Sequence, residues 1–447
     1  MITSQASLDQ TWAAVRQAVD ETVAALEQAV RTRLATDPSL DAVESVVAAS
    51  LQTIGQQVVT GVARWAAARP QPDPVCATCA RPLRRVGVRP RTILGVFGPY
   101  ALTRPYGVCA AGHGGVAPAD GAWGVGSTRL SPRLTAVLSR VTIDLPFDAV
   151  GAVVAATLGV TVDGETIRRA VEAVGQVAEA ADQAAAAAPV PPPAAAAPAG
   201  LVIAVDGAMG HTEGAWHEAK VGVCHPLGRT GPTTVAPHGA PDYCVGLESR
   251  AAFWPRLYAH AVAAGVTHRT CQVITLIGDG AHWIWDDGAT YFGEAERELV
   301  EILDFYHAAE HLTVVAHAVW GEGTPTAQAW LATQRAALQA AGPAPLFAAL
   351  AALPPLPAAA QAVVTRETGY FTYHRARMQY PAYRARGLPI GSGRVEGAYE
   401  VILKQRLSQA GMRWRRPGAQ AVATLRALHR SRRWETLWAR GLPSTAA

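Results

Sequence analysis

The sequence offers little that could hold the chain in a membrane or direct it out of the cell. Residues 1–30 carry acidic and polar residues throughout and lack the apolar stretch of a signal peptide. No uninterrupted apolar run reaches the ~18–20 residues that a helix needs to cross a bilayer. We therefore expect a soluble, cytoplasmic protein without a membrane partner.

Cysteine is also scarce, with six in 447 residues. Three of them, Cys224, Cys244 and Cys271, are scattered along the chain. This scatter argues against the dense disulfide framework of small secreted domains. It favours inert, buried thiols in a reducing compartment.

Acids are missing from one segment and nearly missing from another, although the net charge is only +4. Residues 76–113 hold six Arg and no acid, and residues 404–440 hold ten Lys or Arg beside the single acid Glu435. One basic block alone is often just a solvated face. Two of them on one chain favour a polyanionic partner.

Four residues of the acid-free segment have the spacing of metal ligands. Cys76-x2-Cys79 and Cys109-x3-His113 form two knuckles, and Zn²⁺ takes four such ligands in a tetrahedron. The residues between the knuckles alternate like two strands, with a turn expected at 97–100. We predict a zinc ribbon whose closed metal site is structural. The alternative is four unrelated residues.

Periodicity and composition divide the rest of the chain into modules. Residues 8–68 have apolar positions at helical spacing and predict two or three helices. The Ala/Pro-rich segment 184–200 predicts an extended linker and a domain boundary. After it, strand and helix patterns alternate, with an amphipathic helix expected at 294–303. Residues 313–385 are mostly Ala/Leu-rich and predict helices.

Residues 146–175 read as helix, Leu-Gly-Val turn and helix, with the second helix starting near Asp163. This pattern suits a helix-turn-helix with its second helix in a DNA groove. A helical hairpin used only for packing is the alternative. The residues that we expect at the DNA are Arg84, Arg85, Thr166, Arg168, Arg169, Lys404, Arg406 and Arg413.

Two aspartates each follow an apolar run and precede a glycine: Asp206 after LVIAV and Asp279 after VITLIG. We expect both at the carboxyl ends of strands, where open α/β sheets place ligand sites. Glu396 follows a PIGSG break that predicts a helix start. Three carboxylates held in this way can bind a pair of Mg²⁺ ions for phosphoryl transfer. Glu400, one turn further along the helix, is the reserve candidate.

Other motifs have weaker interpretations. His307, Glu310 and His311 match an inverted zinc-protease string, but without a third ligand we do not expect a metalloprotease. Asp304 precedes them and could support the carboxylates. For Trp283 and Trp285, we favour packing in the core over stacking on bases; the tryptophans directly follow the second aspartate.

Six blocks resemble, in order, the signature blocks of ISKra-type insertion-sequence transposases of the DDE class. They read VDGAMGHTEGAWHEAKVGV, GDGAHWIW, LDFYHAAEHL, PIGSGRVEGAYEVILKQRL, GMRW and RRWETLW. The resemblance covers about residues 75–440 and includes the zinc-ribbon region. One departure concerns the second knuckle, which in that family is two cysteines and here is Cys109 and His113.

The resemblance implies a DNA transposase with an RNase H-like catalytic domain. Its catalytic triad would be Asp206, Asp279 and Glu396 with Mg²⁺ or Mn²⁺, and a helical insertion would separate the second and third acids. The reaction would be phosphodiester cleavage and strand transfer at the element ends. Expected partners are double-stranded DNA, at element ends and target, and further copies of the chain on that DNA in the nucleoid. A catalytically silent DNA-binding relative and an RNase H-like nuclease that does not join strands remain alternatives.

The sequence thus predicts a multidomain α+β fold. The expected parts are N-terminal helices at 1–70, a zinc ribbon at 71–125, a helix-turn-helix at 130–182, a linker at 183–200, the first part of an α/β RNase H-like domain at 201–323, a helical insertion at 324–385, and C-terminal helices with the third carboxylate at 386–447.

Overall fold

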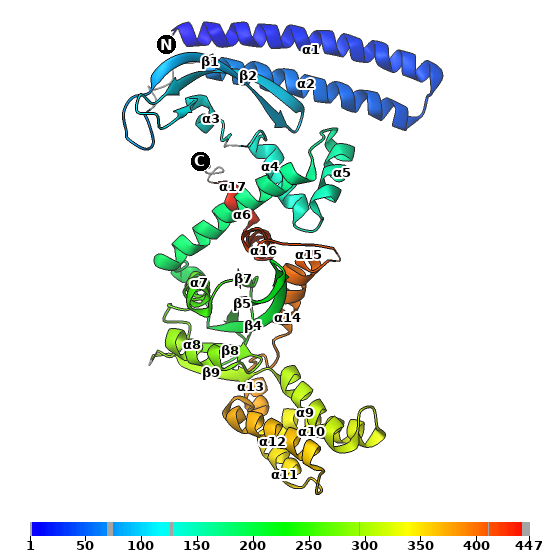
Figure 1. The fold of residues 1–447 in the computed structure, drawn as a ribbon, viewed down its shortest axis with the longest axis vertical. Coiled ribbons are helices and arrows are strands. Elements are labelled where there is room, and N and C mark those ends of the chain that lie inside the picture. Colours follow the sequence, from blue (N-terminus) through cyan, green and yellow to red (C-terminus); the bar gives the residue numbers. More distant parts are fainter. Residues whose placement is uncertain (1, 69–74, 126–127, 295, 410, 440–447) are drawn as a thin grey trace. The chain divides into compact units, whose positions relative to one another are not determined.

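The computed structural model describes residues 2–68, 75–125, 128–294, 296–409 and 411–439. The chain is a mixed α+β protein (Figure 1). It divides into two compact units. Unit 1 is Met1–Val174 with Glu435–Ala447, and unit 2 is Gly175–Trp434. The start of the predicted ribbon, 71–74, lies outside the described residues.

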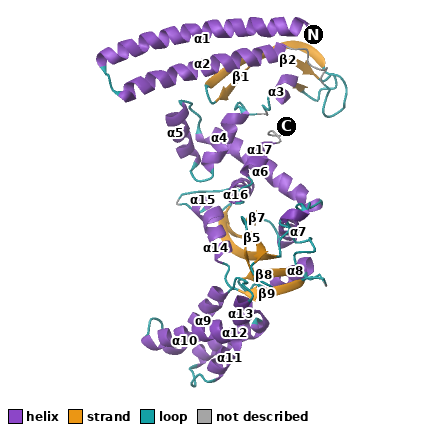
Figure 2. Ribbon diagram, turned by 180° about the vertical axis from the view of Figure 1, so that it is seen from behind, coloured by secondary structure: helices purple, strands orange, loops and turns teal. Residues whose placement is uncertain are grey.

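Unit 1 opens with the predicted helices and the predicted strand hairpin. The elements are α1 (Ile2–Thr36), α2 (Leu40–Ala68), β1 (Arg84–Gly95), β2 (Gly98–Val108), β3 (Gly115–Val116) and α3 (Pro118–Ala122). The hairpin lies beside α2 (Figure 2), where the Arg64 guanidinium donates to the Ala101 carbonyl at 3.2 Å. The turn lies between Gly95 and Gly98, slightly earlier than predicted, because Gly98 and Tyr100 already pair with β1.

Three helices follow, α4 (Pro132–Thr142), α5 (Phe147–Leu158) and α6 (Gly164–Ala187). Helix α5 ends at Gly159, whose φ of 63° is the left-handed conformation that glycine tolerates. Helix α6 begins after Asp163, whose carboxylate accepts from the Thr166 backbone N–H at 2.8 Å, as an N-cap should. The predicted helix, turn and helix are therefore present.

Helix α6 continues into the segment that we predicted as a linker. It ends at Ala187, where the predicted linker began at 183. Alanine is the strongest helix former, so the helix ends only where Pro189 approaches. The division between the two compact units falls within α6, between Val174 and Gly175, and not in the Ala/Pro-rich segment.

Unit 2 is built on a mixed sheet. Its strands are β4 (Gly200–Thr212), β5 (Ala215–Arg229), β6 (Val235–Pro237), β7 (Asp242–Gly246), β8 (Val273–Gly278) and β9 (Glu298–Leu303). Strands β4, β8 and β9 are parallel neighbours, and β5 pairs antiparallel with β4, β6 and β7. All six residues of β8 are buried, as expected for a central parallel strand.

The helices of unit 2 are α7 (Arg250–Ala263), α8 (His282–Phe292), α9 (Phe305–Trp320), α10 (Pro325–Ala341), α11 (Pro343–Ala351), α12 (Ala358–Tyr373), α13 (Tyr380–Ala385), α14 (Gly393–Tyr399), α15 (Gln405–Leu407) and α16 (Arg416–Arg430). Helix α17 (Trp434–Ala439) follows. The helices expected between 324 and 385 are present. The prediction of a helix at 294–303 is wrong, because Glu298–Leu303 forms the strand β9.

Aromatic side chains form much of the core beside the sheet. Trp285 is buried, and Trp283 lies edge-on to Trp254 with ring centroids 6.0 Å apart. Trp254 also stacks on Tyr291 at 5.8 Å. The preference for core packing over base stacking is therefore confirmed for Trp285.

Candidate metal and nucleic-acid sites

The register of the parallel strands brings Asp206 and Asp279 side by side. Val205 of β4 is opposite Gly278 of β8, and each aspartate is the next residue along the chain. Asp279 directly follows the end of β8, as predicted. Asp206 does not end its strand, because β4 continues to Thr212 in a long hairpin with β5. It lies where the parallel pairing ends rather than where the strand ends.

Asp206 lies among like charges. Burial, followed by the charge of Asp279 and then that of Glu396, raises the pKa of Asp206 to about 6. The Gly207 backbone N–H and the His307 ring act in the opposite direction. A carboxylate held against two other acids is stabilised by a nearby cation. The donor set is therefore suited to a hard divalent ion.

Glu396 reaches this edge from α14. The Ser392 hydroxyl donates to one of its carboxylate oxygens at 3.1 Å. The Tyr399 hydroxyl fixes the same helix to β4 by donating to the Met209 carbonyl, also at 3.1 Å. Glu400 lies in a short π-helical segment and forms an exposed ion pair with Lys404 at 3.1 Å. These contacts favour Glu396 over the reserve candidate.

The carboxylate oxygens of Asp206, Asp279 and Glu396 do not all lie within 4.8 Å of one another. Among the described residues, two other groups of possible ligands do have this spacing. Like charges repel across such a site. The charges of Asp279 and Glu396 act on Asp206, but the three acids do not form a group at that ligand spacing.

Asp304 is the third acid in the row formed by the parallel strands. Leu303 of β9 is opposite Gly278, so Asp304 is aligned with Asp279. Its buried carboxylate caps α9 by accepting from the backbone N–H groups of Tyr306 and His307, at 2.6 and 3.0 Å. Its other oxygen accepts from the Ser392 backbone N–H. Asp304 therefore holds the loop at Ser392, whose hydroxyl contacts Glu396.

Helix α12 also reaches the edge of the sheet at Asp279, which no sequence signal indicated. The Tyr370 hydroxyl of α12 donates to the Asp279 carbonyl at 3.0 Å. The Tyr370 ring stacks on His311 with centroids 3.7 Å apart, and His311 pairs with buried Glu367 at 2.5 Å. His307 instead lies 3.3 Å from Glu310. The two histidines thus have separate partners.

The four predicted zinc ligands come together in unit 1. The Cys79 and Cys109 sulfurs are 3.6 Å apart, and His113 Nδ1 lies 3.7 Å from the sulfurs of both Cys76 and Cys109. Ligand atoms around a tetrahedral zinc with bonds of ~2.3 Å would be roughly 3.8 Å apart. The cluster therefore has the size of a four-ligand metal site, as the spacing predicted.

Local backbone geometry builds the two knuckles. Ala80 has a φ of 54°, and Gly112 and Gly114 have φ values of 80° and 95°. These left-handed residues let the chain turn sharply around the sulfurs. Backbone N–H groups of Cys79 and Thr78, with the His113 side chain, lower the pKa of the Cys76 thiol to about 6. A lowered pKa favours the thiolate that binds metal.

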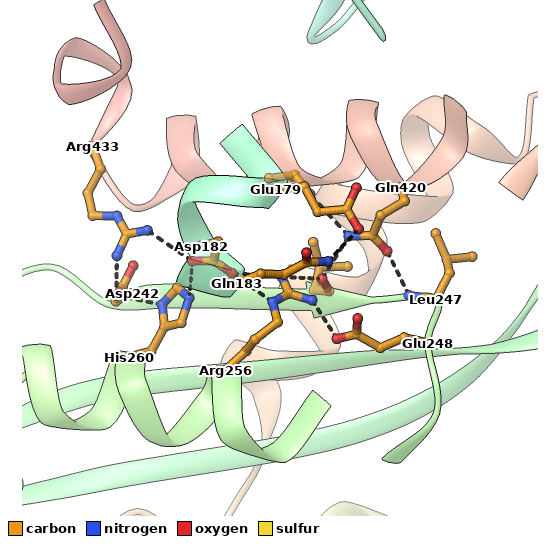
Figure 3. Close-up of polar contacts among 12 residues, drawn as sticks. Glu179, Asp182, Gln183, Asp242, Leu247, Glu248, Arg256, His260, Gln420 and Arg433 are labelled. Atoms are coloured by element: carbon orange, nitrogen blue, oxygen red, sulfur yellow. Dashed lines mark hydrogen bonds and ion pairs between the residues drawn. The ribbon is translucent and has the colours of Figure 1, made fainter. Parts of the chain in front are cut away.

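A second group, Asp182, Cys244 and His260, also has ligand atoms within 4.8 Å of one another. Figure 3 shows that Asp182 and His260 belong to an ion-pair network. His260 lies 2.9 Å from Asp182 and 2.8 Å from Asp242. Arg256 pairs with Asp182 at 2.7 Å, and Arg433 pairs with Asp242 at 2.9 Å.

Both ring nitrogens of His260 face carboxylates, which can only accept, so the ring must be the imidazolium. Burial opposes its charge, but Asp242 and Asp182 hold the pKa of His260 well above its usual value. Two guanidinium groups and this ring already balance the acids. The network is therefore structural and joins α6, β7, α7 and Arg433, and we do not assign it a metal.

The predicted DNA-contacting residues have different environments. Arg84 and Arg85 lie in the exposed first half of β1. Arg168 is held by Glu165 and Glu172, both at 2.6 Å, whereas Arg169 is more exposed. Lys404 is paired with Glu400 and Arg413 is exposed, while Thr166 is half-buried.

Arg406 was wrongly expected at the DNA. Its side chain is 0% exposed. Its guanidinium lies 5.1 Å from the Trp414 ring centroid and contacts the Met412 sulfur. Position in a basic block did not distinguish a long side chain that packs inward from one that points outward.

No protein-family model matches this chain, and a search of curated protein sequences finds no match to it. Among the described helices, none combines the length and apolar character required to cross a bilayer.

Proposed function

We propose that the chain is a DNA transposase whose catalytic acids are Asp206, Asp279 and Glu396. The observation that carries this proposal is the register of β4 and β8, which aligns two aspartates beside a helix-borne glutamate. The strand order β7-β5-β4-β8-β9, three antiparallel strands followed by two parallel ones, is that expected of an RNase H-like sheet. It supports the assignment of unit 2 as the catalytic domain.

The acids suit phosphodiester chemistry. The sheet holds Asp206 and Asp279 on neighbouring strands, and the Ser392 hydroxyl contacts Glu396, so three hard oxygen ligands are available at one edge of the sheet. Two Mg²⁺ or Mn²⁺ ions, when bound, would supply the charge that activates water or a 3′-hydroxyl and stabilises the leaving oxygen. The protein's contribution is positioning and charge placement.

The cluster of Cys76, Cys79, Cys109 and His113 is proposed to hold one structural Zn²⁺. All four ligand positions come from the protein, so no open position remains for catalysis. The proposed partner is double-stranded DNA at the element ends and at the target. Joining two ends requires a pair of active sites, which supports a homo-oligomer on DNA.

The test is cleavage of DNA that carries the segments flanking the gene, where the proposed element ends would lie. We expect nicking or cutting at the element ends with Mg²⁺ or Mn²⁺, and joining to a second duplex. A chelator should stop both steps. Cutting without joining would favour the nuclease alternative. Binding of these segments without cutting, in any divalent metal, would favour the silent DNA-binding relative.

DNA binding by the full chain is expected to weaken steeply as salt rises, because neutralised phosphates release counterions. Arg84→Ala on exposed β1 should weaken binding to all sequences about equally and reduce the salt slope by about one. Arg169→Ala should change the sequence preference if α6 reads bases. Arg406→Lys is the control and should leave binding nearly unchanged, since Arg406 is buried. Salt-independent binding would contradict a phosphate-contacting ribbon.

A further inference from the structure

The α1–α2 hairpin is too thin to form a core of its own. Among its described side chains, the buried hydrophobic residues are Val15, Ala42 and Ala67. Helix α1 has 35 residues and α2 has 29, so they are roughly 52 and 44 Å long at 1.5 Å per residue. Most apolar residues of the two helices are therefore only partly covered.

Among the side chains that the structure describes from residue 8 onward, the exposed large apolar residues of both helices share one repeat. In α1 they are Trp12, Val23 and Leu34, and in α2 they are Leu40 and Leu51. Each is separated from the next on its helix by 11 residues, and all are between 38% and 72% exposed. Eleven residues are about three helical turns with a drift of only ~20°. Each helix therefore carries one straight apolar row.

Contacts between the helices show where each row points. Thr22 of α1 bonds to Gln57 of α2 at 3.2 Å, and Val15 lies against Gly61. At about 100° per residue, the row on each helix lies roughly 90° around the helix axis from the residues that contact the other helix. Viewed along each helix from its N-terminus, the rotation from contact to row has the same direction. Because the helices are antiparallel, the same sense brings both rows to one face of the hairpin.

We propose that this face, the row face, binds the same face of a second copy of the chain. A face two helices wide and about 40 Å long covers roughly 800 Å². That is about the area each partner buries in a standard stable interface. Identical faces meeting about a two-fold axis give the commonest kind of dimer.

The charges beside the rows also favour a protein partner. By helical geometry, Arg16, Glu27 and Glu44 lie nearest the rows. This mixture of signs does not suit DNA or an anionic membrane, which basic faces bind. It allows Arg16 of one copy to meet a glutamate of the other. The proposed dimer adds a surface to the oligomer of the proposed function and does not depend on catalysis.

The test is the oligomeric state of the full-length protein without DNA, measured by sedimentation or by light scattering during gel filtration. The parent should be a dimer. The double variant Val23→Glu with Leu51→Glu places two charges on the row face of each copy, and the symmetric interface brings both sets together. The dimer dissociation constant should therefore rise about 100-fold or more, equivalent to about 2.7 kcal/mol. Ala24→Glu is the control, exposed beside Val23 but about 100° around α1. It should remain dimeric.

A monomeric parent would overturn the proposal, and so would a double variant that dimerises as tightly as the parent. Equal loss of dimer in Ala24→Glu would also overturn it, since charge anywhere on the helix would then suffice. If circular dichroism shows that the double variant has lost helix, Val23→Ser replaces it and should weaken the dimer with helix content unchanged. DNA cleavage is not part of this measurement, so its failure and that of the proposed function are separable.

Discussion

Asp206→Asn is expected to abolish strand cleavage while DNA binding and the fold remain intact. The amide keeps the size of the side chain but removes the charge that a divalent ion needs. Loss of one preorganised electrostatic contact commonly costs about 10²–10³-fold in rate, so we expect at least that decrease. Asp279→Asn and Glu396→Gln should behave alike. The measurement is cleavage of DNA carrying the element ends in Mg²⁺.

The same variant should not weaken the metal-free fold at neutral pH. The pKa of Asp206 is raised to about 6 in the folded chain by burial and by Asp279 and Glu396. A raised carboxyl pKa means that folding favours the protonated form, so ionisation destabilises the fold as pH rises from about 4 to 6. Asp206→Asn removes this penalty. In chelator at pH 8 its Tm should equal or exceed that of the parent.

Glu400→Gln is the matched control for Glu396→Gln. The two glutamates are one turn apart, but Glu396 accepts from Ser392 and contributes to the field at Asp206, whereas Glu400 pairs with Lys404 at the surface. We expect Glu400→Gln to retain most activity. If Glu400→Gln is inactive and Glu396→Gln is active, the third acid is wrongly assigned. If Asp206→Asn cuts as well as the parent, the carboxylate assignment fails.

Strand periodicity predicted the alignment of the two aspartates but not the length of β4. A run of apolar residues before Asp-Gly indicates a buried strand wherever it occurs. Residues 207–212 of β4 contain two glycines and a histidine, which give no strand signal of their own. They are held as strand by pairing with β5. The pairing is a tertiary effect that local sequence does not report.

Ion pairs with distant residues explain the error at β9. Glu298 and Glu301 have a spacing that also suits a helix face. In the fold, Glu298 pairs with Arg386 at 2.6 Å and Glu301 with Arg377 at 2.7 Å. The charges therefore belong to an edge strand whose acids pair with arginines of the segment that follows α12. A large separation in sequence also explains why Tyr370 was not predicted at the site, since it lies 91 residues from Asp279, whose carbonyl it contacts.

The cluster of Cys76, Cys79, Cys109 and His113 was predictable because its spacing needs only short local turns. Two knuckles with two- and three-residue gaps and a hairpin between them leave few ways to place four ligand atoms. Arg91 and Arg104 show the limit of that prediction. Both are held by Asp120 of α3, at 2.7 and 2.6 Å, so the arginines of the ribbon are not all available to phosphates.

Cys76→Ser is expected to remove zinc and unfold the ribbon. Purified parent protein should carry about one zinc per chain by elemental analysis. In small metal modules the binding energy, ~10–16 kcal/mol apparent at pH 7, is the folding energy. The knuckles have little else to hold them, since their buried cluster is Cys76, Cys109 and Leu83 with Cys79 against it. Cys109→Ser should give the same loss.

His113 supplies the controls for this prediction. His113→Cys keeps a ligand of suitable reach and should retain zinc, whereas His113→Ala should lose it. Cys271→Ser tests whether the loss of any thiol would remove zinc. Cys271 is buried in unit 2 and is not one of the four residues of the cluster, so this variant should keep its zinc content unchanged. Proteolysis should cut the zinc-free variants between 75 and 120 first, since β1 and β2 lose the ligand turns that join their outer ends. Well-folded parent protein without zinc, or a Cys76→Ser variant with full zinc content, would show that the four residues are not a metal site.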